Sequence, residues 1–366
     1  MDRRHGLAAL AALGLPTVAG AADPPALGVG PRALRFPADF GAHPDTRTEW
    51  WYVTGWLVLE GEAPAEVGPA FGFQVTFFRS RTDVPADTPS RFAARQLVFA
   101  HAALTDLAAG RLRHDQRLAR AGFGVAEAAT GDTALVLRDW SLRRDGPVGD
   151  GGYRSRVVST AQGFAFDLAF SPTQPLLLQG LAGLSRKGPD PREASHYYSR
   201  PQLAVRGRLQ REARAPAVPV RGRAWLDHEW SETLLHPEAV GWDWIGMNLH
   251  DGAALTAFRL RRRDGSTVWA GGSFRPVGAA APQVFDGADA VGFEPLRWWT
   301  SPATGARYPV GWRVRTPAGA FVVRALLGAQ ELDSRGSTGS VYWEGISELL
   351  TDDAGGRGGW GWGIWR

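Results

Sequence analysis

The stretch RGRAWLDHEWSETLLHPEAVGWDWIGMNL, residues 221–249, is the part of the sequence around which the chain is organised. Titratable and large aromatic side chains are denser here than anywhere else. They are Asp227, His228, Glu229 and Asp243, set among Trp225, Trp230, Trp242 and Trp244. Charged groups are costly to bury unless they are paired, and burial shifts their pKa values. The stretch is therefore either a fully hydrogen-bonded structural cluster or a reaction centre.

The segment Asp227-His228-Glu229 is expected to lie on a strand. Side chains alternate between the two faces of a strand, so Asp227 and Glu229 share one face while His228 and Trp230 share the other. His228 could then enter a cavity as a general acid or base, oriented by an acid from another strand. The alternative is a histidine that is hydrogen-bonded at a domain junction, with both acids paired to arginines. The spacing leaves both interpretations open.

Asp243 lies between two tryptophans, so alternation turns the acid one way and both rings the other. Inside a barrel, desolvation would raise its pKa and make it a proton donor; the alternative is an outward acid with the rings in the core. The candidate catalytic residues are Asp227, His228, Glu229 and Asp243. The candidate ligand-binding residues are Trp230, Trp242, Trp244, Glu49, Trp50, Trp51, His196 and Tyr198.

The sequence carries no motif for a metal, a nucleotide cofactor or a serine nucleophile. It has no H-E-x-x-H and no cysteine, and neighbouring residues on one strand cannot converge on an ion without a second element. Walker, dinucleotide-binding and G-x-S-x-G motifs are also missing. We therefore expect neither a metal nor a cofactor.

The rest of the chain is typical of an all-β protein, because short aromatic and β-branched runs alternate with turn signals such as Asp264-Gly265. The segment 211–219 is the expected domain boundary, between an N-terminal domain at 46–215 and a C-terminal domain at 216–366. A short helix is expected within 231–240. Strands are predicted at 49–59, 71–79, 96–106, 133–143, 154–160, 164–171, 203–208, 242–249, 254–262, 266–274, 296–300, 310–316, 321–327 and 342–350, followed by a terminus rich in Gly and Trp at 358–365.

The first residues and the composition indicate an exported protein. Residues 1–22 combine Arg3 and Arg4, a short apolar run and an Ala-x-Ala site, which predicts a signal peptide before an extended lead-in at 23–45. No segment of the mature chain is long and apolar enough to cross a bilayer as a helix. The net charge of +4 comes from scattered arginines, which disfavours a nucleic-acid partner. We expect a monomer in the periplasm or secreted.

Several motifs resemble the AttH-like family of predicted secreted hydrolases, which is grouped with carotenoid 1,2-hydratases. They are TEWWYVTGWL at 48–57, HYYSRPQL at 196–203, the G-x-A-W-x-DHEWS stretch at 222–231, GWDWIGMNL at 241–249 and YWEGISEL at 342–349. The resemblance covers nearly the whole mature chain. It implies two tandem lipocalin-like antiparallel β-barrel domains, the first of the hydratase type.

The resemblance also implies a chemistry. Carotenoid hydratases protonate a C=C bond and let water capture the cation, so an acid in an apolar cavity is needed rather than a cofactor. His228 and Trp230 match the hydratase His-x-Trp motif, with Asp227 or Asp243 as the acid. Two alternatives remain: a carrier of a hydrophobic small molecule or lipid, serving an ABC-type transporter, or a purely structural seam between domains.

Overall fold

The computed structural model describes residues 28–62, 68–233, 235–351 and 358–365. The predicted signal peptide at 1–22 lies outside the described residues, as does the beginning of the lead-in. Export to the periplasm therefore stays a prediction from the sequence. Within the described part of the chain, no helix is long and apolar enough to cross a membrane.

The described residues form two antiparallel sheets and a single short 3₁₀ turn, η1 (Ala38–Phe40). The first sheet contains β1 (Thr48–Leu59), β2 (Phe71–Arg81), β3 (Gln96–Asp106), β4 (Arg111–Arg120), β5 (Ala126–Ala128), β6 (Ala134–Leu137), β7 (Trp140–Asp145), β8 (Gly152–Ser159), β9 (Phe164–Ser171), β10 (Leu177–Leu178), β11 (Leu184–Arg186), β12 (Ala194–Gln210) and β13 (Val218–Ser231). The second contains β14 (Gly241–Leu249), β15 (Ala254–Arg261), β16 (Thr267–Arg275), β17 (Gln283–Asp286), β18 (Gly292–Thr300), β19 (Arg307–Thr316), β20 (Gly319–Ala325), β21 (Glu331–Ser334), β22 (Ser340–Thr351) and β23 (Gly358–Trp365).

The first sheet curls into a nearly closed barrel. Its order is β4-β3-β2-β1-β13-β12-β9-β8-β7-β6-β5, and the two end strands are joined by a short turn that contains a bridge between Gly122 and Ala126. Alternate residues of the strands fill its interior, as the pattern of β8 shows, where every second residue is buried. Large aromatic side chains such as Phe73 and Trp140 dominate this core.

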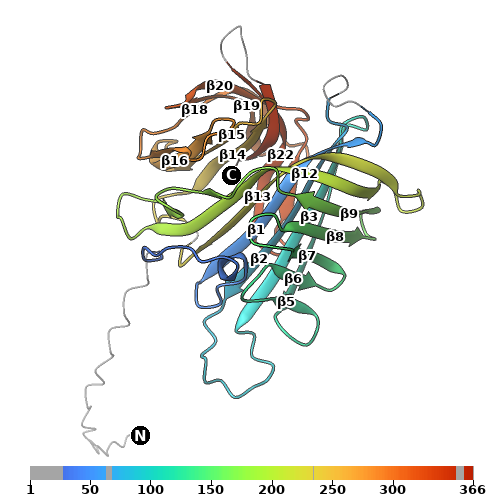
Figure 1. The fold of residues 1–366 in the computed structure, drawn as a ribbon, viewed down its shortest axis with the longest axis vertical. Helices are drawn as coiled ribbons and strands as arrows, with labels where there is room; N and C mark the ends of the chain where they lie inside the picture. Colours follow the sequence, from blue (N-terminus) through green and yellow to red (C-terminus); the bar gives the residue numbers. More distant parts are fainter. Residues whose placement is uncertain (1–27, 63–67, 234, 352–357, 366) are drawn as a thin grey trace, which may run out of the picture.

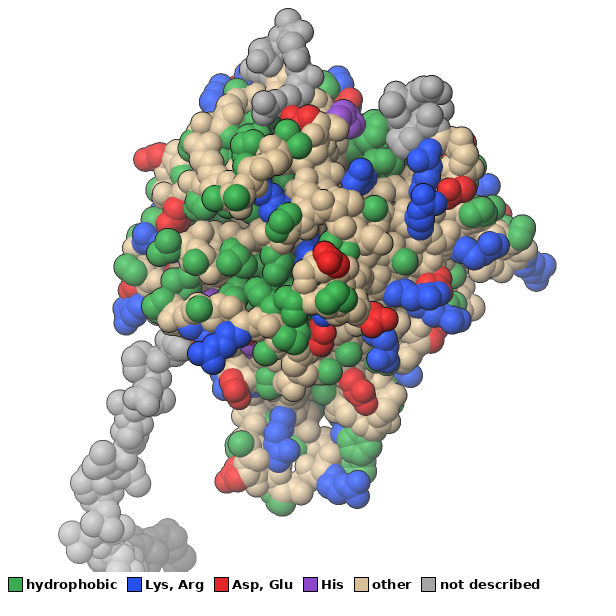
Figure 2. Space-filling view, viewed as in Figure 1, with side chains coloured by type: hydrophobic (Ala, Val, Ile, Leu, Met, Phe, Trp, Pro, Cys, Tyr) green, Lys and Arg blue, Asp and Glu red, His purple; other side chains and the backbone are tan. Residues whose placement is uncertain are grey.

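The second sheet, in the order β17-β16-β15-β14-β23-β22-β20-β19-β18, curves into a half-barrel with its own core around Trp312, Trp343 and Trp365. The prediction of two tandem lipocalin-like barrels in an all-β protein is confirmed. In Figure 1 the second barrel lies beside the wall of the first barrel that contains β12, β13 and β1. Arg side chains are scattered among Asp and Glu on the face in Figure 2.

The outer wall of the first barrel meets the second barrel in a layer of aromatic side chains, which we call the seam. Its buried apolar members include Tyr52, Trp56, Trp225, Trp244, Phe258, Ile346 and Trp362. The two barrels come so close that a Cβ atom added to Gly72 would lie 3.0 Å from the Ile346 side chain. Burial of this many large rings makes the seam a third core of the molecule.

The passage between the sheets differs from the expected boundary at 211–219. That segment connects β12 to β13 within the first sheet, and β13 pairs with β1 from Val220 to Ser231. The chain enters the second sheet only after Ser231. The expected helix within 231–240 is absent from its described residues, which form turns and bends.

Most predicted strands are present, and the differences have local causes. The predicted strand at 133–143 is two strands, β6 and β7, because Arg138 takes a left-handed φ of 58° in the turn between them. The first half of β12 was missed because residues 194–203 are buried on both faces and show no alternation. The bulge between Arg200 and Leu203 further interrupts the pattern.

The close contact of β13 with β1 yields a stability prediction. A Cβ atom on Gly222 would lie 1.8 Å from the carbonyl oxygen of Trp56. We expect Gly222→Ala to lower the free energy of unfolding by about 1–3 kcal/mol, measured by urea denaturation, because the backbones must move apart. The control is Gly30→Ala, where the added atom meets nothing within 4 Å. Equal stabilities of the two variants would contradict this prediction.

Candidate functional site

Strand β13 sends its side chains into two different compartments. His228 and Trp230 face the interior of the first barrel, as the alternation predicts, while Asp227 and Glu229 face the seam and its rim. In the register, His228 lies opposite Trp51 of β1 and Tyr198 of β12. The DHEW segment therefore contributes to two separate sites rather than to one.

The interior of the first barrel contains a buried network of charges, which we call the interior cluster: Asp39, His43, Glu49, Arg79 and His228. Glu49 lies at its centre and is completely buried. Its Oε1 atom is 2.7 Å from His43 Nδ1 and 2.9 Å from His228 Nε2. Its Oε2 atom accepts from Arg79 Nε at 2.7 Å and from the His43 backbone N–H at 2.9 Å. Every lone-pair direction of this carboxylate is thus occupied.

The protonation of the interior cluster follows from these partners. His43 lies between two carboxylates, with Nε2 at 2.9 Å from Asp39, so both of its ring nitrogens donate. Burial alone would lower the pKa of His43, but the hydrogen bonds to Asp39 and Glu49 raise it above its usual value. Burial likewise tends to raise the pKa of Glu49, and the hydrogen bonds from His228 and His43 lower it to about 2. The cluster is an ion network.

His228 is the neutral member of the interior cluster. Burial lowers its pKa to about 4, against the opposing hydrogen bond to Glu49. The Nε2–H group donates to Glu49, and Nδ1 accepts from the Tyr198 hydroxyl at 3.0 Å. The ring stacks on Trp51 with centroids 4.4 Å apart. The acid from another strand that the sequence argument called for is therefore Glu49.

Three members of the interior cluster could hold a metal ion. Ligand atoms of His43, Glu49 and His228 lie within 4.8 Å of one another. Their hydrogen bonds already account for these atoms, since one Glu49 oxygen accepts from both histidines and the other from Arg79. An ion would have to displace those protons beside a guanidinium. The donor set fits a hydrogen-bonded network better than a metal centre.

Asp227, in the seam, has a different environment. Its carboxyl accepts hydrogen bonds from Tyr197 at 2.7 Å, from Ser199 at 2.6 Å and from the Trp225 indole at 2.6 Å. Among the described residues it forms no ion pair. Burial raises its pKa to about 7, although these three hydrogen bonds oppose the shift. The acid is therefore poised to hold a proton near neutral pH.

Glu344 is a second acid of this kind, and the sequence argument did not select it. It is buried in the seam, where it accepts from Tyr52 at 2.6 Å and from the Trp362 indole at 3.0 Å. Burial raises its pKa to about 7, again against neutral donors. The signal that could have found it is a lone acid amid the aromatic and apolar residues of YWEGISEL at 342–349.

The other two predicted catalytic acids are neutralised by cations. Glu229 pairs with Lys187 at 2.9 Å and accepts from Ser195. Asp243 faces the interior of the second barrel and pairs with Arg259 at 2.6 Å and Arg261 at 2.8 Å. The four predicted catalytic residues thus occupy three regions: His228 the interior cluster, Asp227 and Glu229 the seam and its rim, and Asp243 the second barrel.

The predicted ligand-binding residues divide in the same way. Trp50, Trp242 and Trp244 belong to the seam. Glu49 is the centre of the interior cluster, and Trp51, Tyr198, Trp230 and His196 lie around it, where Trp230 stacks on His43 with centroids 3.8 Å apart. Burial lowers the pKa of His196 to about 4, and its Nδ1 atom has no hydrogen-bond partner among the described residues.

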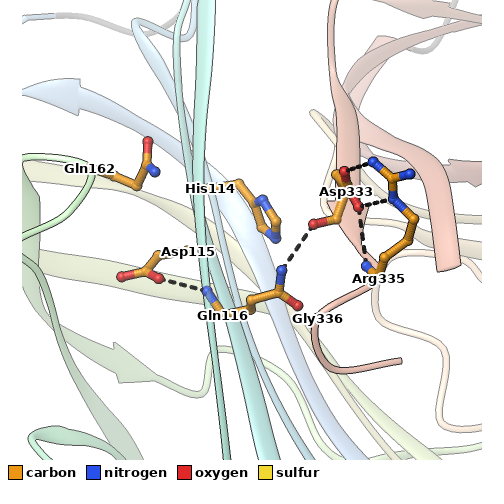
Figure 3. Close-up of a pocket in the computed structure, with 7 residues that line it drawn as sticks. All are labelled: His114, Asp115, Gln116, Gln162, Asp333, Arg335 and Gly336. Carbon is orange, nitrogen blue, oxygen red and sulfur yellow. Dashed lines mark hydrogen bonds and ion pairs between the residues drawn. The ribbon is translucent and has the colours of Figure 1, made fainter. Parts of the chain in front are cut away.

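The described part of the chain contains a small cavity in the seam and a larger cleft away from it. A cavity of about 10 Å³, room for roughly one water, lies in the seam and is lined by Tyr197, Phe258 and Gly271 among others. A cleft of about 470 Å³ lies elsewhere, between β4 and β21 (Figure 3). Polar residues such as His114 and Asp333 line that cleft, and none of the predicted site residues does. Among the seam acids, Asp227 is linked to the smaller cavity through Tyr197.

Comparisons with known proteins give a family and a fold. The family described as AttH-like matches residues 28–362. The chain is similar to the solved structure of an AttH protein from Nitrosomonas europaea, with 45% sequence identity and a TM-score of 0.81; the match covers 93% of this chain and 98% of that chain.

More distant structures share the fold alone. Kievitone hydratase from Nectria haematococca has 14% identity and a TM-score of 0.64, and the match covers 87% of this chain and 88% of that chain. CghA, in a structure with Sch210972, has 12% identity and a TM-score of 0.53 over the same shares. No curated protein sequence matches the chain.

The interior cluster yields a second stability prediction. Replacing Glu49 by Gln leaves the buried Arg79 and His43 without their shared anion. We expect a loss of about 3–5 kcal/mol in the free energy of unfolding at pH 7, measured by urea denaturation. The control is Glu348→Gln, which breaks an exposed pair with Arg324 and should cost less than about 1 kcal/mol. A Glu49 variant as stable as this control would refute the ionic description of the cluster.

Proposed function

The chain belongs to the AttH-like family, and from this premise we propose that it is a cofactor-independent acid catalyst that adds water to a C=C bond of an apolar, isoprenoid-like substrate. The proposed site is the seam, with Asp227 as the proton donor. The hydratase of similar fold is consistent with this proposal but does not carry it, because fold alone does not fix function.

The observation that carries the proposal is the missing counter-ion of Asp227. Buried acids that serve structure are paired with cations, as Asp243 is with Arg259 and Glu229 is with Lys187. Asp227 has only neutral donors, and its raised pKa means that the ionised form is destabilised in the fold. An acid that keeps its proton near pH 7 is what general acid catalysis requires.

The surroundings of Asp227 support the same chemistry. Tyr197 connects it to the seam cavity, and burial together with Asp227 raises the pKa of that phenol well above its usual value, so the hydroxyl keeps its proton. The Asp227 proton would pass through this hydroxyl to one alkene carbon. A water would add to the resulting cation and return its proton to the carboxylate. The aromatic faces of Trp225 and Trp244 could stabilise that cation.

Access of a substrate would require movement in the seam. The cavity beside Tyr197 has room for about one water, so an isoprenoid chain would need the two barrels to move apart. The described strands change sheet once, between β13 and β14, so no second connection of the backbone opposes such a movement, but it would have to separate the packed rings of the seam. A carrier of a hydrophobic ligand would need the same opening, and only turnover separates the two. Delivery to an ABC-type transporter stays a prediction.

The test uses Asp227→Asn, which keeps the shape of the side chain and removes the titrating acid. With geranylgeraniol as probe and heavy-oxygen water as label, we expect hydration to fall by about 10²–10⁴-fold while binding of the probe is kept. In the native chain the rate should fall as pH rises through about 7, since Asp227 must be protonated. The control, Asp333→Asn, alters an exposed acid paired with Arg335 and should leave the hydration rate and the binding of the probe unchanged.

Two outcomes would count against catalysis. Binding of the probe without any labelled product, in the native chain, would indicate a carrier. Turnover in Asp227→Asn equal to that of the native chain would remove Asp227 from the chemistry.

A further inference from the structure

Two phenylalanines are exposed to solvent at one end of the first barrel. Phe92 is 70% exposed and Phe123 is 54% exposed, and their rings stack with centroids 5.5 Å apart and planes at 2°. They come from two different loops, the β2–β3 loop and the β4–β5 turn. Figure 1 shows these loops at the end of the first barrel that lies farthest from the second barrel. Paired exposed aromatic rings are unfavourable in water unless something covers them.

The backbone at Phe123 supports the view that this exposure is a built feature. Its φ is 61°, in the left-handed region that bulky residues avoid, and glycines with positive φ flank it on both sides. Gly122 and Gly124 make the turn possible, but Phe123 itself stores conformational energy there. Strain of this kind is retained where it places a side chain for use.

An apolar row on the outer face of the sheet ends two residues from Arg120, the β4 residue that lies over both rings of the aromatic pair. Phe78, Phe99 and Leu118 lie side by side on β2, β3 and β4, and the rings of the first two stack at 4.7 Å. Leu118 is 45% exposed. The second barrel covers the sheet face as far as His101, which is hydrogen-bonded to Tyr342 of β22. The apolar row begins beside His101, where Phe78 contacts its ring. This part of the sheet face has no partner among the described residues.

Arginines surround the aromatic pair. The Arg120 guanidinium lies over both rings, 5.1 Å from the centroid of Phe92 and 4.1 Å from that of Phe123. Arg91 and Arg95 are within a few residues of Phe92 along the chain, and the backbone N–H of Arg138 donates to the carbonyl of Val125 beside the β4–β5 turn; like Arg120, these arginines form no ion pair among the described residues. The unpaired acids equally near in sequence are Asp87 and Glu127, so positive charge is in excess.

We propose that this tip, formed by Phe92, Leu118, Arg120 and Phe123, docks on a phospholipid surface that carries anionic headgroups. Aromatic rings favour the boundary between headgroups and acyl chains, and arginines beside them pair with phosphates while their stems remain in apolar surroundings. Excess positive charge selects an anionic surface. The tip is independent of the seam, and the inference goes beyond the proposed function and requires no part of it.

The experiment is sedimentation of the full chain with vesicles of phosphatidylcholine alone or mixed with phosphatidylglycerol. We expect the native chain to sediment with the anionic vesicles and much less with the neutral ones. The double variant Phe92→Ser/Phe123→Ser should bind anionic vesicles at least about tenfold more weakly. Arg120→Gln should lose the preference for phosphatidylglycerol. The matched control is Leu181→Ser, which removes an 82% exposed apolar side chain outside the tip and should bind as the native chain does.

Three results would overturn the inference. The first is a native chain that sediments with neither kind of vesicle. The second is equal binding by the native chain and the double variant. The third is a native dimer in solution that the double variant abolishes, which would assign the tip to a second copy of the chain. Hydration of geranylgeraniol is assayed without vesicles, so the two proposals can fail separately. Circular dichroism verifies that each variant is folded.

Discussion

The alternation of side chains along β13 is the constraint on which the rest of the structure depends. Because β13 pairs with β1 on one side and β12 on the other, it is a wall of the first barrel and a surface of the seam at once. Its even-numbered residues, His228 and Trp230, complete the interior cluster. Asp227 instead enters the aromatic layer between the barrels. A shift of the register by one residue would exchange the two sets.

The buried acids differ in how their charge is neutralised. Glu49 has Arg79 and a protonated His43, so its carboxylate remains ionised. Asp243 pairs with two arginines, which oppose the rise of its pKa that burial causes. Asp227 and Glu344 have only phenol, hydroxyl and indole donors, and burial decides their pKa. Such acids reduce stability at high pH, because the fold must then bury an unpaired charge. An acid that lowers the stability of the fold in this way is better explained by a function than by a structural role.

The all-β architecture and most strands could be predicted from alternating apolar residues, which report burial on one face of a sheet. Strand β4 was not predicted because charged residues replace apolar ones on its inward face. Arg117, for example, donates a hydrogen bond to the Val158 carbonyl at the end of β8. The site was only partly predictable. His43, Tyr197 and Glu344 gain their meaning from partners distant in sequence, and proximity in sequence wrongly grouped Asp243 with Asp227 although a change of sheet separates them.

The central claim is that Asp227 holds its proton near neutral pH. Infrared difference spectra between the native chain and Asp227→Asn test it directly, because the carbonyl band of the protonated carboxyl is isolated and the Glu344 signal cancels. The account predicts a band that disappears with a midpoint near pH 7. A midpoint near the ordinary aspartate value of about 4 would show that the acid is ionised in the seam, and the proposed catalyst would be lost.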